Sequence, residues 1–294
     1  MIDRRSLLAV AAAGFAIGCR PAPDPQRQDA DLTGNGLFDD LARKLDGGIG
    51  ISALDTGSGR RVDFDAISRY SLCSTFKLPL AGMILALNDA GQLALNETIA
   101  FTAADRVPYA PFIERHMDRG EAAIAELCEA AVTVSDNVAA NLLLRRIGGP
   151  EAFTQWLRSI GDTTTRLDRI EPDLNSNIPG DPRDTTTPAA MLDTVHKLAL
   201  GNVLTPASRA QLAAWMVACE TGDKRLRAGV PSEWRVGDKT GTSTNGASND
   251  VAIIWPPESA PILIACFINN DRVTAEDRDA AHAEVARRIL HAFS

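Results

Sequence analysis

Segments with strand character lie at the two ends of this chain, and the long stretch between them has helical character. Strands are predicted at five places: 48–55, 60–65, 233–242, 249–256 and 261–269. Helices are predicted from residue 74 to about 220, and a closing helix runs from Thr274 to Phe293. A sheet must pack against other elements to cover its apolar face. This order therefore predicts an α+β fold, in which an antiparallel sheet domain flanked by helices carries an inserted all-helical domain.

The same order sets the expected domain boundaries. The sheet domain should comprise residues 36–70 and 225–294, and the helical domain residues 71–224. The chain of 294 residues is 45% hydrophobic and 23% charged, which is typical of a globular protein. Its net charge of −8 disfavours nucleic acid and anionic lipid surfaces as partners. We expect a monomer.

The first residues carry the signals of an exported protein. Arg4-Arg5 precedes the apolar run 7–17, which is too short to cross a membrane as a helix. The arginine pair predicts a twin-arginine export signal over residues 1–18, followed by a flexible tether over 19–35. Ala16-Ile17-Gly18-Cys19 resembles a bacterial lipobox, which would make Cys19 a lipidated N-terminus, and the alternative is cleavage by the ordinary signal peptidase. We therefore expect a periplasmic protein, either free or anchored to the membrane.

Ser74 and Lys77 form an S-x-x-K pattern where a helix is expected to start. Ser71, Ser74 and Thr75 are residue types that cap helices, and apolar residues then recur at helical spacing. A helix N-terminus favours negative charge, so it suits an oxygen nucleophile and its oxyanion. Lys77 lies one turn further on the same face, where its amine can reach the serine hydroxyl. Burial or nearby cations would lower the pKa of Lys77 and carboxylates would raise it, so the direction stays open.

Two further motifs follow Ser74 in a fixed order. Ser135-Asp136-Asn137 precedes a helical run that stops at Gly148-Gly149-Pro150, so these residues can also cap that helix. Lys239-Thr240-Gly241-Thr242 follows a short predicted strand, where Gly241 would let a ligand approach the strand edge. S-x-x-K, S-D-N and K-T-G together are the signature of a serine enzyme that opens β-lactams. Each motif alone is a weak signal, whereas the ordered set is hard to reach by chance.

Glu171 supplies a carboxylate between the second and third motifs. It lies in the stretch 166–180, which is too rich in Pro, Asn, Asp and Gly for regular structure. Hydrolysis of an acyl-enzyme needs a base that activates water, and Asn175 can hold that water beside the glutamate. The alternative is that this stretch is an ordinary acidic surface loop without a catalytic role.

Together these residues resemble a class A serine β-lactamase, from about residue 35 to the C-terminus. Flanking residues support the resemblance, namely Tyr109, Pro111, the run 141–144 and Arg225. The resemblance implies that Ser74 is the nucleophile of an acyl-enzyme and that Glu171 with Asn175 activates the water that releases it. Either Lys77 or Glu171 would take the serine proton during acylation.

The resemblance also implies roles for the other motif residues. Ser135 would pass a proton to the lactam nitrogen, and Asp136 would make structural hydrogen bonds. The backbone N–H groups of Ser74 and Thr242 would form the oxyanion hole. Arg169 and Asp184 match the ion pair that ties the ends of the family's loop. The expected substrate-binding residues are Asn137, Asn175, Lys239, Thr240, Gly241, Thr242, Arg225 and Tyr109.

One departure from the family concerns the cation that holds the substrate carboxylate. Many class A enzymes carry an arginine on the strand after K-T-G, but the matching position here is Ser248. Arg225 is expected to replace it, as in the branch that includes several carbapenem-hydrolysing enzymes. The disulfide of that branch starts at the position of Cys73, but its partner position is Ser243, so the bridge cannot form. Carbapenem activity is therefore not predicted.

The remaining cysteines and the histidines predict neither a disulfide nor a metal. Cys128 matches half of a helix–helix disulfide common in the family, but the partner position is Ala81. Cys219 and Cys266 are expected to be small apolar residues in a helix and a strand. The four histidines lie far apart, without the spacing of metal ligands. We expect no cofactor, and a zinc β-lactamase is disfavoured.

Three other functions compete with β-lactam hydrolysis. A penicillin-binding DD-peptidase would share S-x-x-K and K-T-G and form the same acyl-enzyme, but it would lack an efficient base such as Glu171 with Asn175. A non-catalytic penicillin-sensing lipoprotein is disfavoured because every catalytic residue type is present. A generic serine esterase is disfavoured because no G-x-S-x-G motif occurs. The expected substrates are penicillin- and cephalosporin-type β-lactams.

Overall fold

The computed structural model describes residues 32–33, 36–46 and 48–294, which belong to one compact unit. The expected export signal and Cys19 lie outside the described residues. The expected tether over 19–35 overlaps a short strand, β1 (Leu32–Thr33), whose backbone pairs in parallel with β3. The structure differs from the expectation at these two residues, because β3 offers them an open edge.

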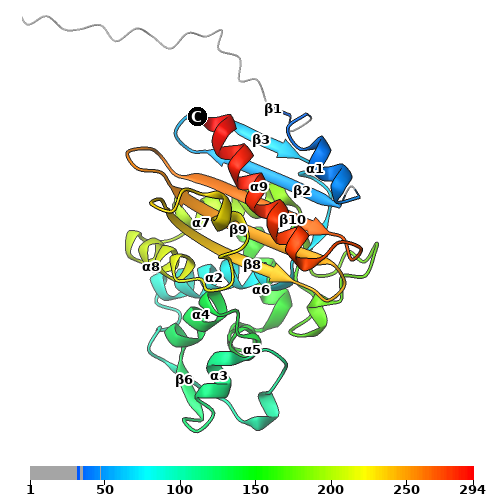
Figure 1. Cartoon of the computed structure of the whole chain (residues 1–294). Coiled ribbons are helices and arrows are strands. Elements are labelled where there is room, and N and C mark those ends of the chain that lie inside the picture. Colours follow the sequence, from blue (N-terminus) through cyan, green and yellow to red (C-terminus); the bar gives the residue numbers. More distant parts are fainter. Residues whose placement is uncertain (1–31, 34–35, 47) are drawn as a thin grey trace, which may run out of the picture. The chain divides into compact units, whose positions relative to one another are not determined.

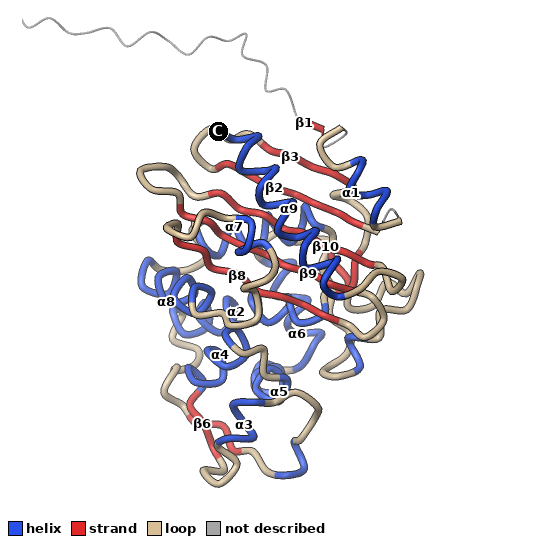
Figure 2. Tube along the Cα trace, viewed as in Figure 1, coloured by secondary structure: helices blue, strands red, loops and turns tan. Residues whose placement is uncertain are grey.

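A six-stranded sheet forms the centre of the unit, with strand order β1-β3-β2-β10-β9-β8. All pairings except that of β1 are antiparallel. The larger strands are β2 (Ile49–Asp55), β3 (Arg61–Phe64), β8 (Arg235–Thr242), β9 (Ala247–Trp255) and β10 (Ile262–Asn269). Each lies within two residues of its expected position. Figure 2 shows these strands as a twisted layer between helices.

Helices cover both faces of the sheet, so the sheet separates two hydrophobic cores. Alternate side chains of a strand point to opposite faces. Leu263, Ala265 and Phe267 of β10 accordingly join one core, while Ile264 and Cys266 join the other. In Figure 1, α9 (Ala275–Phe293) crosses the near face of the sheet. The second face packs against α7 (Pro188–Ala199) and α8 (Pro206–Val217).

The middle of the chain is mainly helical, as expected. Its remaining helices are α2 (Lys77–Asp89), α3 (Pro111–Arg115), α4 (Ile124–Thr133), α5 (Asn137–Ile147) and α6 (Gly149–Ser159), and α1 (Asp39–Lys44) lies between β1 and β2 in the chain. Four short strands lie in or beside this region and were not expected: β4 (Tyr70–Ser71), β5 (Thr98–Ala100), β6 (Glu121–Ala123) and β7 (Thr185–Thr186). They pair as β4 with β7 and β5 with β6, and so close loops between helices.

This architecture confirms the predicted α+β fold with an antiparallel sheet. The division into residues 36–70 with 225–294 and residues 71–224 stays a prediction. Within the second of these ranges, α7 and α8 pack directly against strands of the sheet. In the described part of the chain, no helix combines the length and the apolar character that a membrane span requires.

Candidate active site

Ser74 lies in a tight turn that leads into α2. The turn is the 3₁₀ helix η1 (Cys73–Phe76), and α2 begins only at Lys77. The expected side-chain cap is absent at the start of both elements. Thr75 Oγ1 instead donates to the carbonyl oxygen of Leu72, at 2.6 Å. The hydroxyl of Ser74 is therefore not consumed by capping and remains available for the contacts below.

The ammonium group of Lys77 connects the first two motifs with Glu171. Its side chain is fully buried. Nζ donates to Ser74 Oγ at 2.9 Å and to the carbonyl oxygen of Ser135 at 2.9 Å. It also lies 2.5 Å from Asn137 Oδ1 and 3.0 Å from Glu171 Oε1. Burial lowers the pKa of Lys77, against the opposing effect of the Glu171 carboxylate. This is the direction that the sequence left open.

Ser135, Asp136 and Asn137 have three different structural roles. Ser135 adopts a positive φ of 59°, and its carbonyl oxygen accepts from Lys77. Asp136 is the N-cap of α5, where Oδ1 accepts from the Ala139 N–H, so capping belongs to this residue alone. Asn137 Nδ2 donates to the carbonyl oxygen of Pro108 at 2.8 Å. One amide hydrogen of Asn137 remains for a ligand.

Glu171 is held from both sides by asparagines. Asn175 Nδ2 donates to Glu171 Oε2, while Oε1 faces Lys77 and lies 3.4 Å from Ser74 Oγ. The second asparagine, Asn141 on α5, brackets the backbone of Glu171: its Nδ2 donates to the carbonyl oxygen and its Oδ1 accepts the N–H, both at 2.9 Å. Sequence reasoning assigned no role to Asn141. The available signal was a single asparagine within an apolar helical run.

The expected ion pair closes the base of the loop that carries Glu171. Arg169 Nε donates to Asp184 Oδ2 at 2.6 Å. Asp184 is fully buried, and its Oδ1 also accepts the backbone N–H groups of Asp168 and Arg169. A buried carboxylate with several donors forms a specific and rigid joint. The Glu171–Pro172 peptide bond is cis.

The third motif lies on β8, beside the turn that carries Ser74. Its Gly241 serves close packing of that turn as well as the expected access of a ligand. A Cβ on Gly241 would lie 2.9 Å from the carbonyl oxygen of Leu72 and 3.1 Å from the Cβ of Cys73. Lys239 is fully buried, and its Nζ donates to the carbonyl oxygen of Thr240 at 3.0 Å. Burial lowers the pKa of Lys239 to about 8.

Arg225 reaches the third motif from the segment that precedes β8. Ser248, at the position where many class A enzymes are expected to carry an arginine, supplies no charge. The guanidinium donates to the carbonyl oxygen of Gly241 at 3.0 Å and to Thr242 Oγ1 at 2.8 Å. Asp279 on α9 anchors it through Nε at 2.9 Å. Ser248 is buried opposite Thr242, and its hydroxyl lies 3.2 Å from His282 Nε2. The cationic group next to Thr242 is thus that of Arg225.

The two positions of the missing disulfide take part in other contacts. Cys73 is a buried free thiol 3.6 Å from Ser71 Oγ, and burial raises its pKa to about 12. Ser243 Oγ donates to the carbonyl oxygen of Asn175 at 2.6 Å. Cys128, Cys219 and Cys266 are also buried free thiols. Over the described ranges, no group of three His, Cys, Asp or Glu side chains could hold a metal ion.

A cavity of about 480 Å³ opens over the three motifs. Its walls include Ser74, Ser135, Asn137, Asn175, Thr240, Gly241, Thr242, Arg225 and Tyr109. Tyr109 is 58% exposed, and its carbonyl oxygen accepts the backbone N–H of Asn137. Lys77, Glu171 and Lys239 are buried beneath these walls. The structure thus gathers all the predicted catalytic and binding residues at one place.

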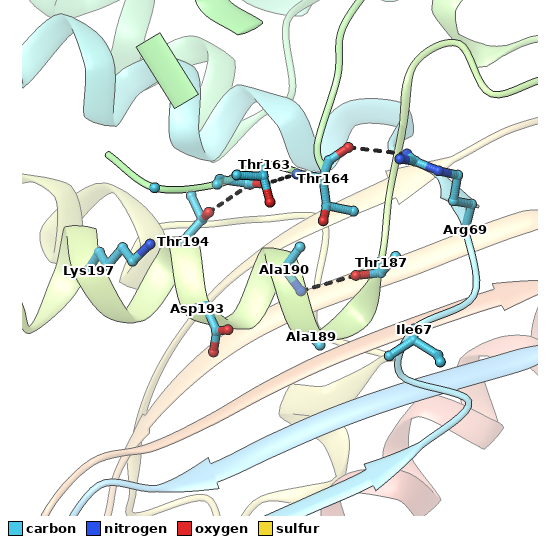
Figure 3. Close-up of a pocket in the computed structure, with 12 residues that line it drawn as sticks. Ile67, Arg69, Thr163, Thr164, Thr187, Ala189, Ala190, Asp193, Thr194 and Lys197 are labelled. Carbon is cyan, nitrogen blue, oxygen red and sulfur yellow. Dashed lines mark hydrogen bonds between the residues drawn. The ribbon is translucent and has the colours of Figure 1, made fainter. Parts of the chain in front are cut away.

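A second hollow of about 470 Å³ contains none of the motif residues (Figure 3). It lies beside α7, where Thr187 caps the helix by accepting from the backbone N–H of Ala190. Both carboxylates in its wall already have partners within the fold: Asp162 accepts from Thr194, and Asp193 pairs with Arg61. The hollow over the motifs is therefore the candidate active site.

Comparison with known proteins identifies the family. A model of the β-lactamase enzyme family matches residues 37–293. The chain is 43% identical to β-lactamase AST-1 from Nocardia asteroides, over 99% of this chain and 96% of that protein. It is 42% identical to a β-lactamase from Mycobacterium tuberculosis, over 93% of this chain and 90% of that protein.

Solved structures agree with these relatives. An ancestral (GNCA) class A β-lactamase matches with a TM-score of 0.86 at 52% identity, over 88% of this chain and 99% of that chain. A β-lactamase from Xanthomonas campestris matches with a TM-score of 0.85 at 46% identity, over 88% of this chain and 97% of that chain. The chain therefore belongs to the β-lactamase enzyme family and is a class A β-lactamase, an enzyme that hydrolyses β-lactams.

Proposed function

We propose that this enzyme opens penicillin- and cephalosporin-type β-lactams through an acyl-enzyme on Ser74, which water activated by Glu171 then hydrolyses. One observation carries the proposal: Ser74 Oγ lies within 2.9 Å of Lys77 Nζ and 3.4 Å of Glu171 Oε1. Two groups that can accept a proton thus lie beside one hydroxyl, which a serine nucleophile requires.

In the first step, Ser74 Oγ attacks the lactam carbonyl carbon and the C–N bond breaks. The serine proton passes to Lys77 or Glu171, and the lactam nitrogen gains a proton through Ser135. The lowered pKa of Lys77 makes its ammonium group easier to deprotonate, which supports the amine as one candidate base. Lys77 Nζ and Glu171 Oε1 lie 3.0 Å apart, so a proton taken by either group stays beside the other. Backbone N–H groups of Ser74 and Thr242 would stabilise the oxyanion.

In the second step, water attacks the ester and restores the hydroxyl of Ser74. Glu171 would take a proton from this water, and the product leaves with a new carboxylate. Asn175 supports this step because its Nδ2 binds Glu171 Oε2, while its buried Oδ1 has no partner among the described residues. That Oδ1 can accept a hydrogen bond from the attacking water.

The substrate carboxylate would bind at the end of the cavity where Thr240 and Thr242 carry hydroxyl groups. Lys239 and Arg225 supply positive charge there. Removing a carboxylate from water is costly unless it is paired, so two cations suit this position. The exposed Tyr109 and the free amide hydrogen of Asn137 would contact the side chain of the antibiotic.

Hydrolysis of nitrocefin and of a penicillin by the purified protein tests this function. Ser74→Ala should abolish turnover, and Glu171→Ala should accumulate an adduct on Ser74, visible by intact-mass spectrometry. A wild-type protein that forms the adduct but does not release it would indicate a DD-peptidase instead. A wild-type protein that forms no adduct would indicate a non-catalytic scaffold.

A further inference from the structure

Three asparagines attach the loop that carries Glu171 to one end of the sheet, where β8 turns into β9 and β10 ends. Asn177 Nδ2 donates to the carbonyl oxygen of Asn245 at 2.6 Å and to Asn269 Oδ1 at 2.7 Å. Asn245 Nδ2 donates in return to the carbonyl oxygen of Ser176 at 2.7 Å. Asn245 lies in the turn between β8 and β9, and Asn269 ends β10. We call these three residues the asparagine tether.

The asparagine tether connects this loop to the sheet where backbone hydrogen bonds between the two do not. In the described part of the chain, the backbone-to-backbone hydrogen bonds of residues 172–180 are all local turns. Leu174 anchors the loop from below, because it is fully buried. Ser176 and Asn177 therefore depend on side-chain contacts for their position against the sheet. Asn177 has a φ of 45°, a left-handed conformation that asparagine tolerates better than most residues.

The tether begins one residue after the residue that contacts the proposed base. Asn175 binds Oε2 of Glu171, whereas Oε1 faces Ser74 and Lys77. Movement of residues 176–177 would therefore displace the side of the carboxylate that faces Asn175. Lys77 is held independently of this loop, by the carbonyl oxygen of Ser135 and by Asn137 Oδ1, and its Nζ in turn donates to Ser74 Oγ.

We propose that Asn177 and Asn245 are positioning residues for deacylation, which hold Asn175 and through it Glu171 in place. This inference rests on the proposed two-step mechanism. It assigns the asparagine tether to the release of the acyl-enzyme rather than to its formation. Acylation and deacylation have different kinetic signatures, so kinetics of folded variants can test the assignment.

Asn177→Asp and Asn245→Ala are suitable variants. The aspartate substitution at Asn177 keeps a side chain of similar size that tolerates the left-handed backbone, but its carboxylate cannot donate a hydrogen bond. Asn245 is exposed, so its truncation leaves no buried cavity. Asn202→Ala, at an exposed position between α7 and α8, is the matched control. Thermal melting of each variant shows whether it is folded.

The measurement is steady-state hydrolysis of benzylpenicillin, together with the acylated fraction in rapidly quenched samples. Slower deacylation lowers kcat and KM together and leaves kcat/KM unchanged. We expect both constants to fall by about fivefold in each tether variant, the scale of one hydrogen bond. The acylated fraction should rise on Ser74, and Asn202→Ala should match the wild type.

Two results would overturn the inference. One is a fall in kcat/KM, which indicates loss of active protein or slower acylation. The other is unchanged kinetics in both variants. Failure of the proposed function itself looks different, since the wild type would then form no adduct on Ser74 or Glu171→Ala would deacylate normally.

Discussion

At the scale of single residues, burial decides how the charged groups of the site behave. Lys77 has a carboxylate 3.0 Å away, which by itself would raise its pKa. The complete burial of its side chain outweighs this effect and lowers the pKa. Lys239 follows the same rule, with a second cation, Lys77, near enough to add to the shift. Both amines are therefore closer to their neutral form than exposed lysines are.

The pKa of Lys239 predicts an alkaline limit to substrate binding. Only the protonated amine attracts the substrate carboxylate, and its pKa is about 8. Above this pH, kcat/KM should fall by about tenfold per pH unit at most, as the charged fraction falls. Lys239→Arg should remove this alkaline limb, because a guanidinium stays protonated. A wild-type kcat/KM that is level from pH 7 to 10 would contradict the prediction.

Arg225 is expected to supply the second charge for the substrate carboxylate. Arg225→Ala should lower kcat/KM. The corresponding loss of transition-state stabilisation should be about 1.5–3 kcal/mol, the scale of a charge-assisted hydrogen bond. Steady-state kinetics with a penicillin measures this loss. Lys224→Ala is the control, because Lys224 is an exposed neighbouring cation. Arg227 is unsuitable, since it pairs with the fully buried Asp238. Equal losses in the Arg225 and Lys224 variants would place the second cation elsewhere.

At the scale of secondary structure, single side chains join elements that are distant in sequence. Asn141 connects α5 to the loop of Glu171. Asp279 connects α9 to Arg225 beside β8. Asp136 accepts the backbone N–H groups of Phe112 and Ile113 on α3 as well as that of Ala139 on α5. The site is therefore held by joints between elements as much as by the elements themselves.

Removal of the Asp136 joint should destabilise the protein strongly. Asp136→Ala would leave three backbone donors without their acceptor, two of them at buried contacts. We expect a loss of about 2–4 kcal/mol in the free energy of unfolding, from the lost cap and the unsatisfied groups. Urea denaturation measures it. Asp118→Ala, at an exposed position in the same region, should change stability little. Equal stability of the two variants would show that the hydrogen bonds of Asp136 do not contribute to the free energy of unfolding.

At the scale of the whole molecule, one sheet supports the site from two sides. The core on the α7 and α8 face holds α2 with Lys77, and the core on the α9 face holds the segment next to Arg225. Residues far apart in sequence, from Ser74 to Thr242, line one cavity beside β8, which is the edge strand of the sheet (Figure 1). A substitution in either core would therefore alter the positions of residues at the cavity.

We propose that the protein is exported to the periplasm by the twin-arginine route, where it is either free or anchored through a lipid on Cys19. Arg4-Arg5 and the Gly18-Cys19 junction motivate this proposal. Replacement of Arg4 and Arg5 by lysine should leave full-length protein in the cytosol in cell fractionation. Cys19→Ser should instead release exported protein from the membrane fraction. Full-length wild-type protein in the cytosol would reject export, and a soluble wild-type N-terminus beyond Cys19 would reject the anchor.

The sequence by itself determined those features that are written in short patterns. The continuous apolar run 262–269 and the helical spacing in 275–293 predicted β10 and α9 closely, because a strand buried on both faces is apolar throughout and a helix buried on one face is periodic. The order of three motifs and a glutamate predicted which residues gather at the cavity. These signals are local, or repeat at a fixed spacing, so they need no knowledge of distant contacts.

Only the tertiary structure decided how these residues act on one another. The direction of the Lys77 pKa, the bracket that Asn141 forms around Glu171 and the asparagine tether all depend on contacts between distant segments. The start of α2 at Lys77 was also missed, because packing of the Ser74 turn against Gly241 outweighs local capping preferences. Burial and hydrogen bonding between elements are set by the packed fold, and no local pattern records them.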